Sequence, residues 1–472
     1  MADRADRLHA IDLVWLEMQG DGPPIAIGTV AVAEGPAPAD GELLSMVADR
    51  LDRMPRLHQD LTDRGVGLRR PLWVEAQEVD LPAHLHHVDA TAAGDHPGLD
   101  AAVGRIMEQS LPPDQPLWDM WVVDGLEDRW ALVWRIHHTI ADGVGALILL
   151  GHGFDLAVDG GGTLADAVLA NQPAQPDGLA GEPTVAPREG PLSLTALASE
   201  VGHSLDGVLS VLRGAAPHVI PAVTALIPHP PSHLAGEVGP RRMWVSVDLP
   251  LVGVKSTGRA LGASVNDIVL ACVAGGFRDL LIHRGEPVSG RVVRNLVPVS
   301  MRAPGDDSSQ NRVSGTLGHL PVGIADPVAR LAEVRAGVAH GRGFGTPALA
   351  SALLGLVDRS VPASVQDVAI AMVGRTAPAW FLDTLTTNVP GPQFPVYLCG
   401  RRVVAMYPVI PVAGHTCITT GIFSYDGTLN VGVTGDADQA GDIDVLARGI
   451  SRAAAELAER ARQIDDAGQP ER

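Results

Sequence analysis

The sequence predicts an α/β protein with two domains. A chain of 472 residues is longer than one hydrophobic core usually supports, so two full-sized cores are expected. Stretches with the two-residue period of strands alternate with stretches that have the 3.6-residue period of helices, on both sides of a central segment. This segment is rich in Gly, Pro, Ala and Ser, which indicates a connector. We divide the chain into an N-terminal domain (1–160), a connector with a helical segment (161–240) and a C-terminal domain (241–472).

Local patterns predict each element of the N-terminal domain. In order, these are a helical turn at 13–18, a strand at 25–33, a helix from Asp40 to before Pro55, a helix at 97–111 and a hairpin that turns at 125–128 and ends at His138. Three histidines follow Pro82 in a strand or loop that supplies no fourth metal ligand. We interpret them as surface or hairpin residues: His84, His86 and His87.

The connector and the C-terminal domain are divided in the same way. The connector is expected to contain a loop at 171–190 and a helix at 192–212. A strand at 242–249 and a helix ending at Gly262 follow, and Ser264 and Asp267 then have the spacing of a capping box. The remaining expectations are a strand at 292–300, helices near 328–339 and 347–373, a Pro/Gly-fixed loop at 386–392, a hairpin at 422–433 with an Asp-Gly turn and an amphipathic helix at 443–464.

Composition excludes several classes of partner. With 35 basic and 55 acidic residues the formal charge is −20, which argues against nucleic acid and against broad binding to an anionic membrane. The cysteines lack metal or redox spacing and the N-terminus has no apolar core behind its charges, so a cytoplasmic protein without a signal peptide is expected. The longest uncharged stretch, 215–235, is too rich in proline and histidine to span a bilayer, although it could lie on a lipid surface.

The strongest chemical signal is a pair of histidines at the end of an alternating apolar run. Side chains alternate along a strand, so His138 shares a face with Trp134 and Ile136, whereas His137 faces the other side. We therefore expect one imidazole to serve as a base and the other to hold the strand end. His138 is our candidate for the base, because imidazole titrates near neutral pH and can take a proton from a hydroxyl.

The residues after the histidines predict a turn into a helix. Gly143 allows a tight bend, and Asp142 could cap the helix or pair with a cation. A single histidine on an apolar strand is more often a core residue, so the pattern is only suggestive by itself. Two histidines and an aspartate also suggest zinc. However, adjacent histidines on a strand point apart, and no partner lies at ligand spacing, so a metal site is disfavoured.

Several short motifs occur together in a fixed order. They are Pro116-Leu-Trp118, His137-His138-x-x-x-Asp142-Gly143, Asn266-Asp267, 297–302 (Val-Pro-Val-Ser-Met-Arg), Asn388-Val-Pro-Gly-Pro and Ser424-Tyr425. In this order and spacing the chain resembles the bacterial wax ester synthase/diacylglycerol acyltransferase family over nearly its whole length. The family's usual Ser-Asn before Val-Pro-Gly-Pro reads Thr387-Asn388 here, which keeps a hydroxyl.

The resemblance implies two chloramphenicol-acetyltransferase-like sandwich domains with a tunnel between them. It also implies transfer of a fatty acyl group from acyl-coenzyme A to diacylglycerol or a long-chain alcohol, with no bound cofactor. His138 would be the general base, His137 a supporting residue and Asp142 a structural support. The oxyanion needs a donor from the opposite domain, and the candidates are Asn266, Ser300 and Asn388. The residues expected to bind substrate are Gly143, Pro116, Trp118, Ser300 and Asn388.

Two other readings remain open. Condensation domains of peptide synthetases share the double-histidine motif and accept acyl groups from carrier proteins, but Pro-Leu-Trp and Asn-Val-Pro-Gly-Pro favour the lipid family. A lipid-binding relative without turnover is the second alternative, and the intact motifs count against it. A cysteine nucleophile is disfavoured because no cysteine lies in a motif. Lipid substrates also lead us to expect peripheral contact with the inner membrane face or lipid inclusions.

Overall fold

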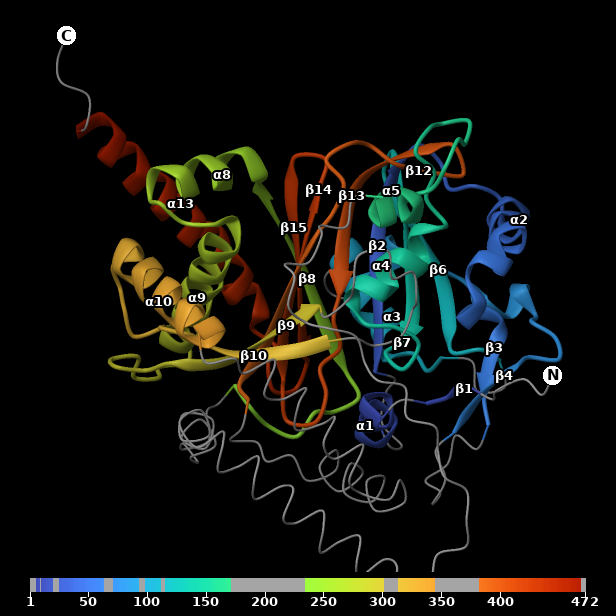
Figure 1. Cartoon of the computed structure of the whole chain (residues 1–472), viewed down its shortest axis with the longest axis horizontal. Helices are drawn as coiled ribbons and strands as arrows, with labels where there is room; N and C mark the ends of the chain where they lie inside the picture. The colour runs from blue at the N-terminus through green and yellow to red at the C-terminus, as the bar shows by residue number, and fades with distance from the viewer. Residues whose placement is uncertain are drawn as a thin grey trace, which may run out of the picture.

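The architecture is that of two mixed β-sheets that meet in the middle of the molecule (Figure 1). It is seen in a computed structural model, which describes residues 6–8, 10–19, 25–62, 71–92, 98–111, 115–170, 234–300, 313–343 and 382–467. Each main sheet has six strands, and a small three-stranded sheet, β1-β4-β3, lies at the N-terminal end. The α/β prediction is confirmed. The predicted elements at 171–190, 192–212 and 347–373 lie outside the described residues.

The N-terminal sheet has the strand order β12-β13-β2-β7-β6-β5. Its helices are α1 (Ala10–Gln19), α2 (Asp40–Arg50), α3 (Leu99–Glu108), α4 (Gly143–Gly151) and α5 (Leu164–Ala170). Its central strand, β7 (Arg129–His137), is buried from Trp130 onwards, because β2 (Ala26–Glu34) and β6 (Trp118–Leu126) pair with its two edges. The predicted hairpin is therefore present as β6–β7. The short strands are β1 (Asp6–Arg7), β3 (Gln59–Leu61), β4 (Leu72–Glu75) and β5 (Leu85–Asp89).

The C-terminal sheet has the order β10-β9-β11-β14-β15-β8. Its strands are β8 (Arg242–Pro250), β9 (Val293–Ser300), β10 (Val313–Leu320), β11 (Thr384–Pro390), β14 (Ile418–Tyr425) and β15 (Thr428–Asp436). The predicted Asp-Gly turn joins β14 to β15, with positive φ at both Asp426 (40°) and Gly427 (85°), as a two-residue hairpin requires.

Helices cover the outer side of the C-terminal sheet, away from the N-terminal sheet (Figure 1). They are α8 (Leu251–Ala260), α9 (Val265–His283), α10 (Pro327–Gly343) and α13 (Ile443–Ala467). The amphipathic prediction for the last helix is confirmed, since Leu446, Ile450 and Leu457 are buried. Helices α9 and α13 pack closely because glycines meet at their crossing: a Cβ on Gly449 would lie 2.7 Å from the Cα of Gly276.

The two sheets do not follow the division of the chain into an N-terminal and a C-terminal part. Strand β13 (Arg401–Val409) pairs antiparallel with β2, with Tyr407 opposite Val30, and so completes the N-terminal sheet. The short β12 (Tyr397–Leu398) pairs with β13 at its outer edge. Sequence analysis missed this strand pair. In Figure 1 the orange β13 lies beside the blue β2, which connects the two halves through shared backbone hydrogen bonds.

Two predictions about local structure are wrong. Residues Thr384–Pro390 form strand β11 and not a loop; it runs parallel to β14 and pairs with β9 only at Thr384 and Leu385. Among the described residues β9 pairs with β11 at no later position, so Pro390 interrupts no hydrogen bond between these two strands. His84 is also not a surface residue. It is fully buried, its Nδ1 lies 2.7 Å from the carbonyl oxygen of Trp118, and its ring stacks on the Trp118 indole.

Within the described ranges no single helix is long and apolar enough to cross a bilayer; α8 and α9 reach that length and apolar character only as a pair bent by 101°.

Candidate active site

The paired histidines lie where β7 leaves the N-terminal sheet. The backbone N–H of His137 donates to the carbonyl of Leu117 at 2.9 Å, and that of His138 donates to the carbonyl of Ile25 at 2.9 Å. The strand end is thus held by both neighbours, so the two side chains diverge as the alternation predicts. His137 is buried, with Nε2 2.8 Å from Oε1 of Gln19 and Nδ1 2.9 Å from the Thr139 hydroxyl.

His138 occupies a different environment. Its ring stacks on the indole of Trp15, with centroids 4.2 Å apart and an interplanar angle of 14°. Burial lowers the pKa of His138, and a bond to its own backbone and the nearby charge of Asp142 oppose that effect without cancelling it. A lowered pKa leaves the imidazole neutral at physiological pH. The side chain is still partly exposed, so a neutral base is available to a bound molecule.

Asp142 caps the helix that follows the histidines. Its Oδ1 accepts a hydrogen bond from the N–H of Gly145 at 2.7 Å, and its carbonyl oxygen accepts from Ala146 at 2.6 Å. The carboxylate is 1% exposed. Asp142 therefore fixes the start of α4, which is one of the two roles that its position after the histidines allowed.

The C-terminal sheet faces the start of α4 from the other side of the site. Asn388 on β11 donates from Nδ2 to Oδ1 of Asn266 on α9 at 3.3 Å. The capping box of Ser264 and Asp267 is present, so Asp267 serves the helix start while Asn266 contacts β11. A Cβ on Gly143 would lie 3.8 Å from Cγ2 of Val389, which places the start of α4 directly against β11.

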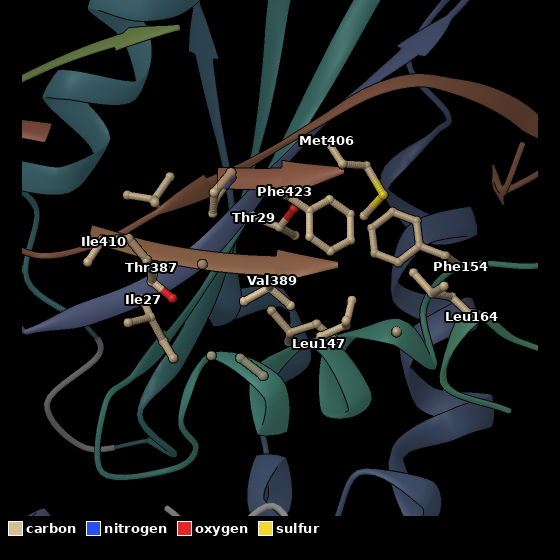
Figure 2. Close-up of a pocket in the computed structure, with 17 residues that line it drawn as sticks. Ile27, Thr29, Leu147, Phe154, Leu164, Thr387, Val389, Met406, Ile410 and Phe423 are labelled. Atoms are coloured by element: carbon tan, nitrogen blue, oxygen red, sulfur yellow. The ribbon is translucent and has the colours of Figure 1, made fainter. Parts of the chain in front are cut away.

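An apolar cavity of about 70 Å³ lies between the sheets beside these elements. Figure 2 shows Ile27, Thr387 and Ile410 at one end, Val389 and Leu147 along the middle, and Phe154, Leu164 and Met406 at the other end. Its walls come from β2, α4, β11, β13 and β14. Gly143 lines it and Thr387 adjoins Asn388, so the first end lies next to the paired-histidine motif. The motif therefore reaches this apolar space through Gly143, whereas His138 is not among the described residues that line it.

The predicted site residues do not all gather at this cavity. Gly143 lines it, whereas Pro116 and Trp118 do not appear in its wall as the structure describes it. Trp118 is fully buried and donates from Nε1 to the carbonyl of Leu57 at 2.9 Å, so it packs the N-terminal core. Ser300 ends β9 opposite Val313, and its side chain lies outside the described set.

Thiol and metal chemistry find little support at the site. Burial raises the pKa of Cys272 to about 12 and those of Cys399 and Cys417 to about 11, so these thiols stay protonated at neutral pH. Among the described residues no group of three or more His, Cys, Asp or Glu side chains could hold a metal ion.

Sequence analysis missed two residues that contact the histidines, Trp15 and Gln19. They belong to α1, which was predicted only as a short turn. Their four-residue spacing is typical of one helix face, but nothing in the local sequence shows that this face meets β7.

Two mixed sheets, with the paired histidines at the end of β7 and the Asp142-Gly143 start of α4, define the two-sheet fold class of this chain. Solved structures of this class are similar in fold. A wax ester synthase/diacylglycerol acyltransferase from Marinobacter aquaeolei VT8 superposes with a TM-score of 0.64 at 19% identity, covering 97% of this chain and 100% of that one. The starter condensation domain of rhizomide synthetase, in complex with C8-CoA and Leu-SNAC, gives a TM-score of 0.54 at 14% identity, covering 97% of this chain and 94% of that one.

The chain belongs to the wax ester synthase/diacylglycerol acyltransferase family. The family's catalytic domain matches residues 8–269 and its C-terminal domain matches residues 309–458. A Mycobacterium tuberculosis H37Rv protein named "Probable diacyglycerol O-acyltransferase tgs1" is 32% identical over 436 residues, which cover 92% of this chain and 91% of that protein. The resemblance inferred from the motifs is thus confirmed.

Proposed function

We propose that the protein transfers a long-chain acyl group from acyl-coenzyme A to the hydroxyl of diacylglycerol, and that a fatty alcohol can serve as a second acceptor. The observation that carries the proposal is the position of His138. A neutral, partly exposed imidazole follows the last residue of β7, and Gly143 of the same motif lines an apolar cavity between the sheets. Such a site brings a base and an alkyl-binding space together, as ester formation between two lipids requires.

In the proposed mechanism His138 acts as the general base. It takes the proton of the acceptor hydroxyl while the oxygen attacks the thioester carbonyl, an effect typically worth ~10² to 10⁴-fold. The tetrahedral intermediate then collapses, the carbon–sulfur bond breaks, and the coenzyme A thiolate receives the proton from the imidazolium. The ester and free coenzyme A are the products. The acyl group goes directly from thioester to alcohol, so no residue of the chain is acylated.

The developing oxyanion needs a hydrogen-bond donor on the side opposite the base. Asn388 and Asn266 lie on the C-terminal wall, and their side chains contact each other at 3.3 Å. We infer that one amide holds the other, so that an Nδ2 donor is fixed toward the reaction space. Ser300 remains a candidate from its place at the end of β9.

We assign a segment of the acyl chain to the cavity between the sheets, since a volume of about 70 Å³ is too small for a whole long chain. All the side chains labelled along it are apolar except Thr29 and Thr387 (Figure 2). Each methylene that leaves water contributes about 0.8 kcal/mol, so an alkyl chain is the natural occupant. Relatives support the choice of substrates: the mycobacterial protein is named a diacylglycerol O-acyltransferase, and the condensation domain of similar fold was solved with C8-CoA.

The test is coenzyme A release from palmitoyl-coenzyme A, measured with a thiol reagent, with dioleoylglycerol and hexadecanol offered separately. Wild type should release coenzyme A only when an acceptor is present. In His138→Ala the rate of this release should fall by at least ~10²-fold. His87→Ala is the matched control, because His87 is exposed on β5 and pairs with Asp40 far along the sheet from the motif. Release unaffected by His138→Ala would refute the assignment of the base.

If the wild-type protein releases no coenzyme A, two alternative functions remain and can be distinguished. If palmitoyl-coenzyme A gives no release with either acceptor, the same acyl group is offered on a carrier protein. Turnover with the carrier alone would identify a condensation-type transferase, the activity named for some proteins of similar fold. Tight binding of palmitoyl-coenzyme A without turnover by either route would identify a lipid-binding protein.

We also infer peripheral contact with lipid, because both proposed acceptors reside in membranes or lipid inclusions and segment 215–235 is free of charged residues. The test is flotation with dioleoylglycerol-containing vesicles, either neutral or anionic. Comigration is expected with neutral vesicles, and recovery of all protein in the pellet fraction with both kinds would remove this inference.

A further inference from the structure

One face of helix α1 contacts both histidines of the motif. The Trp15 indole stacks on the His138 imidazole with centroids 4.2 Å apart, and Oε1 of Gln19 lies 2.8 Å from Nε2 of His137. Trp15 and Gln19 are four residues apart, so they lie one above the other on the same side of the helix. A single rigid element therefore reaches two side chains that point in different directions from β7.

We propose that this face of α1 positions the histidine pair for reaction: Trp15 holds the ring plane of His138, and Gln19 holds His137 and the strand end. The proposal deepens the proposed function, on which it rests for the role of His138 as base. Neither Trp15 nor Gln19 needs to touch the reacting atoms, so both are positioning residues.

The stacked geometry suits a base. The lone pair of an imidazole nitrogen lies in the plane of the ring, so an indole on the ring face leaves the nitrogen at the edge available to a hydroxyl. At 14° between planes the two rings are nearly parallel, and rotation of His138 about its ring torsion would break this contact. Trp15 thus restricts the direction of the base without blocking it. It also shields one ring face from water and so contributes to the burial that lowers the pKa.

Gln19 acts through the neighbouring residue. Its Oε1 accepts from the N–H of Ile25 at 3.1 Å as well as contacting His137. Because an amide oxygen only accepts, Nε2 of His137 carries the proton, and Nδ1 is left to accept from Thr139, whose hydroxyl lies at 2.9 Å. One side chain therefore connects Ile25, the residue before β2, to His137, the last residue of β7.

The composition of α1 favours a positioning role over simple packing. A helix that only covers a core presents apolar residues on its inner face, because buried polar groups are costly. Here Asp12, one turn before Trp15, is 2% exposed, and Gln19 contacts the histidine. The charged group that acts on His138 is Asp142, the N-cap of α4, and His137 precedes it on β7; both residues are left unchanged in the test.

The test compares three variants of the full-length protein. Trp15→Leu removes the ring, and Trp15→Phe keeps an aromatic face. Trp121→Leu is the matched control, since Trp121 contacts another histidine, His86, with centroids 4.6 Å apart. Histidine titrations are followed by NMR on protein without substrate, with the His138 signal assigned from His138→Gln. Rates are measured with palmitoyl-coenzyme A and dioleoylglycerol.

Trp15→Leu should raise the pKa of His138 toward its ordinary value of 6.5, because water reaches the ring face that the indole covered. We expect kcat to fall roughly tenfold or more with KM for palmitoyl-coenzyme A nearly unchanged, since orientation and not binding is lost. Trp15→Phe should keep both the pKa of His138 and kcat close to their wild-type values. Trp121→Leu should shift the titration of His86 and leave that of His138 in place.

The titration needs no turnover, so it remains informative if the proposed function fails. A His138 pKa and a kcat that are both unchanged in a folded Trp15→Leu protein would overturn the positioning role. The two readouts can also disagree. If kcat falls in Trp15→Leu while the titration of His138 does not shift, and Trp15→Phe does not restore kcat, the loss reflects general damage to the structure and the positioning role is overturned. For the second contact, Gln19→Met keeps the length and removes the acceptor, and an unchanged kcat would overturn the role of Gln19.

Discussion

Substitutions of Asp142 can distinguish its two contributions: the cap at the start of α4 and the negative charge near His138. The carboxylate is buried, its Oδ1 accepts from the Gly145 N–H at 2.7 Å, and its charge favours the protonated form of His138. Asp142→Asn keeps an acceptor oxygen and removes the charge. Asp142→Ala removes both. The two variants therefore report on the cap and on the charge separately.

The expected magnitudes follow from these contacts. Loss of an N-cap costs about 0.5 to 2 kcal/mol in the free energy of unfolding, so Asp142→Ala should lose about that amount. Asp142→Asn should lose less than about 1 kcal/mol, because only the attraction between the charge and the helix dipole disappears. Without the negative charge the pKa of His138 should move further below 6.5. Since the neutral imidazole is the active form, activity should then persist to lower pH than in wild type.

Urea denaturation measures the free energy of unfolding, and coenzyme A release between pH 4.5 and 8 measures the acid limb, with dioleoylglycerol as acceptor. Ser264→Ala is the control for loss of a cap, because Ser264 caps α9 by accepting from the N–H of Asp267 at 3.2 Å. It should cost a similar amount of stability without moving the acid limb. An acid limb that moves to higher pH in Asp142→Asn would refute the electrostatic reasoning. Loss of all activity in a stable Asp142→Asn protein would refute the supporting role.

Three further predictions concern the base, the cavity and the core. In wild type the acid limb of the pH–rate profile should lie below pH 6.5, because burial lowers the pKa of His138 and activity is lost as pH falls through it; a limb above 7 would contradict this. Ala146→Leu narrows the cavity, so kcat/KM for palmitoyl-coenzyme A should fall relative to octanoyl-coenzyme A by roughly tenfold, and an unchanged ratio would show that the acyl chain lies elsewhere. Asp119→Ala leaves the fully buried Arg135 without the carboxylate that its Nε contacts at 2.8 Å, so urea denaturation should show a loss of about 3 to 5 kcal/mol; a loss under 1 kcal/mol would contradict burial of this pair.

The sequence was sufficient to predict the elements that depend on interactions between residues close together in the chain. The capping box of Ser264 and Asp267, the Asp-Gly turn and the apolar face of α13 all lie where their patterns predicted. The same holds for the histidine pair, because alternation along β7 separates the two side chains whatever lies around them.

Contacts between distant segments explain the errors. Strand β13 carries Arg401, Arg402 and Pro408, so its local pattern is not that of a buried strand, and only pairing with β2 makes it one. His84 has the same composition around it as an exposed histidine, and the indole of Trp118 decides its burial. Strand β11 contains a Pro-Gly signature that predicts a loop, but β11 pairs with β9 only at Thr384 and Leu385, so the proline at 390 breaks no bond between the two strands.

The site residues show the same difference between local patterns and contacts with distant segments. Asp142 and Gly143 could be placed from their order in the motif. By contrast, Trp118 belongs to a motif but packs the core, and Trp15 belongs to no recognised motif but contacts His138. Position within a motif indicates which residues occur together, whereas the approach of α1 to β7 depends on the complete fold.

The pairing of β13 with β2 also sets the order in which the protein can be completed during synthesis. Partner residues such as Val32 and Ala405 are separated by roughly 370 residues, so a ribosome working at about 5 to 20 residues per second needs on the order of 20 to 75 seconds to supply the missing strand. Until then one edge of β2 has open backbone donors and acceptors, a surface that invites pairing with other nascent chains. The N-terminal sheet is therefore begun first and finished almost last, and a chain released before β13 is made would leave that edge uncovered.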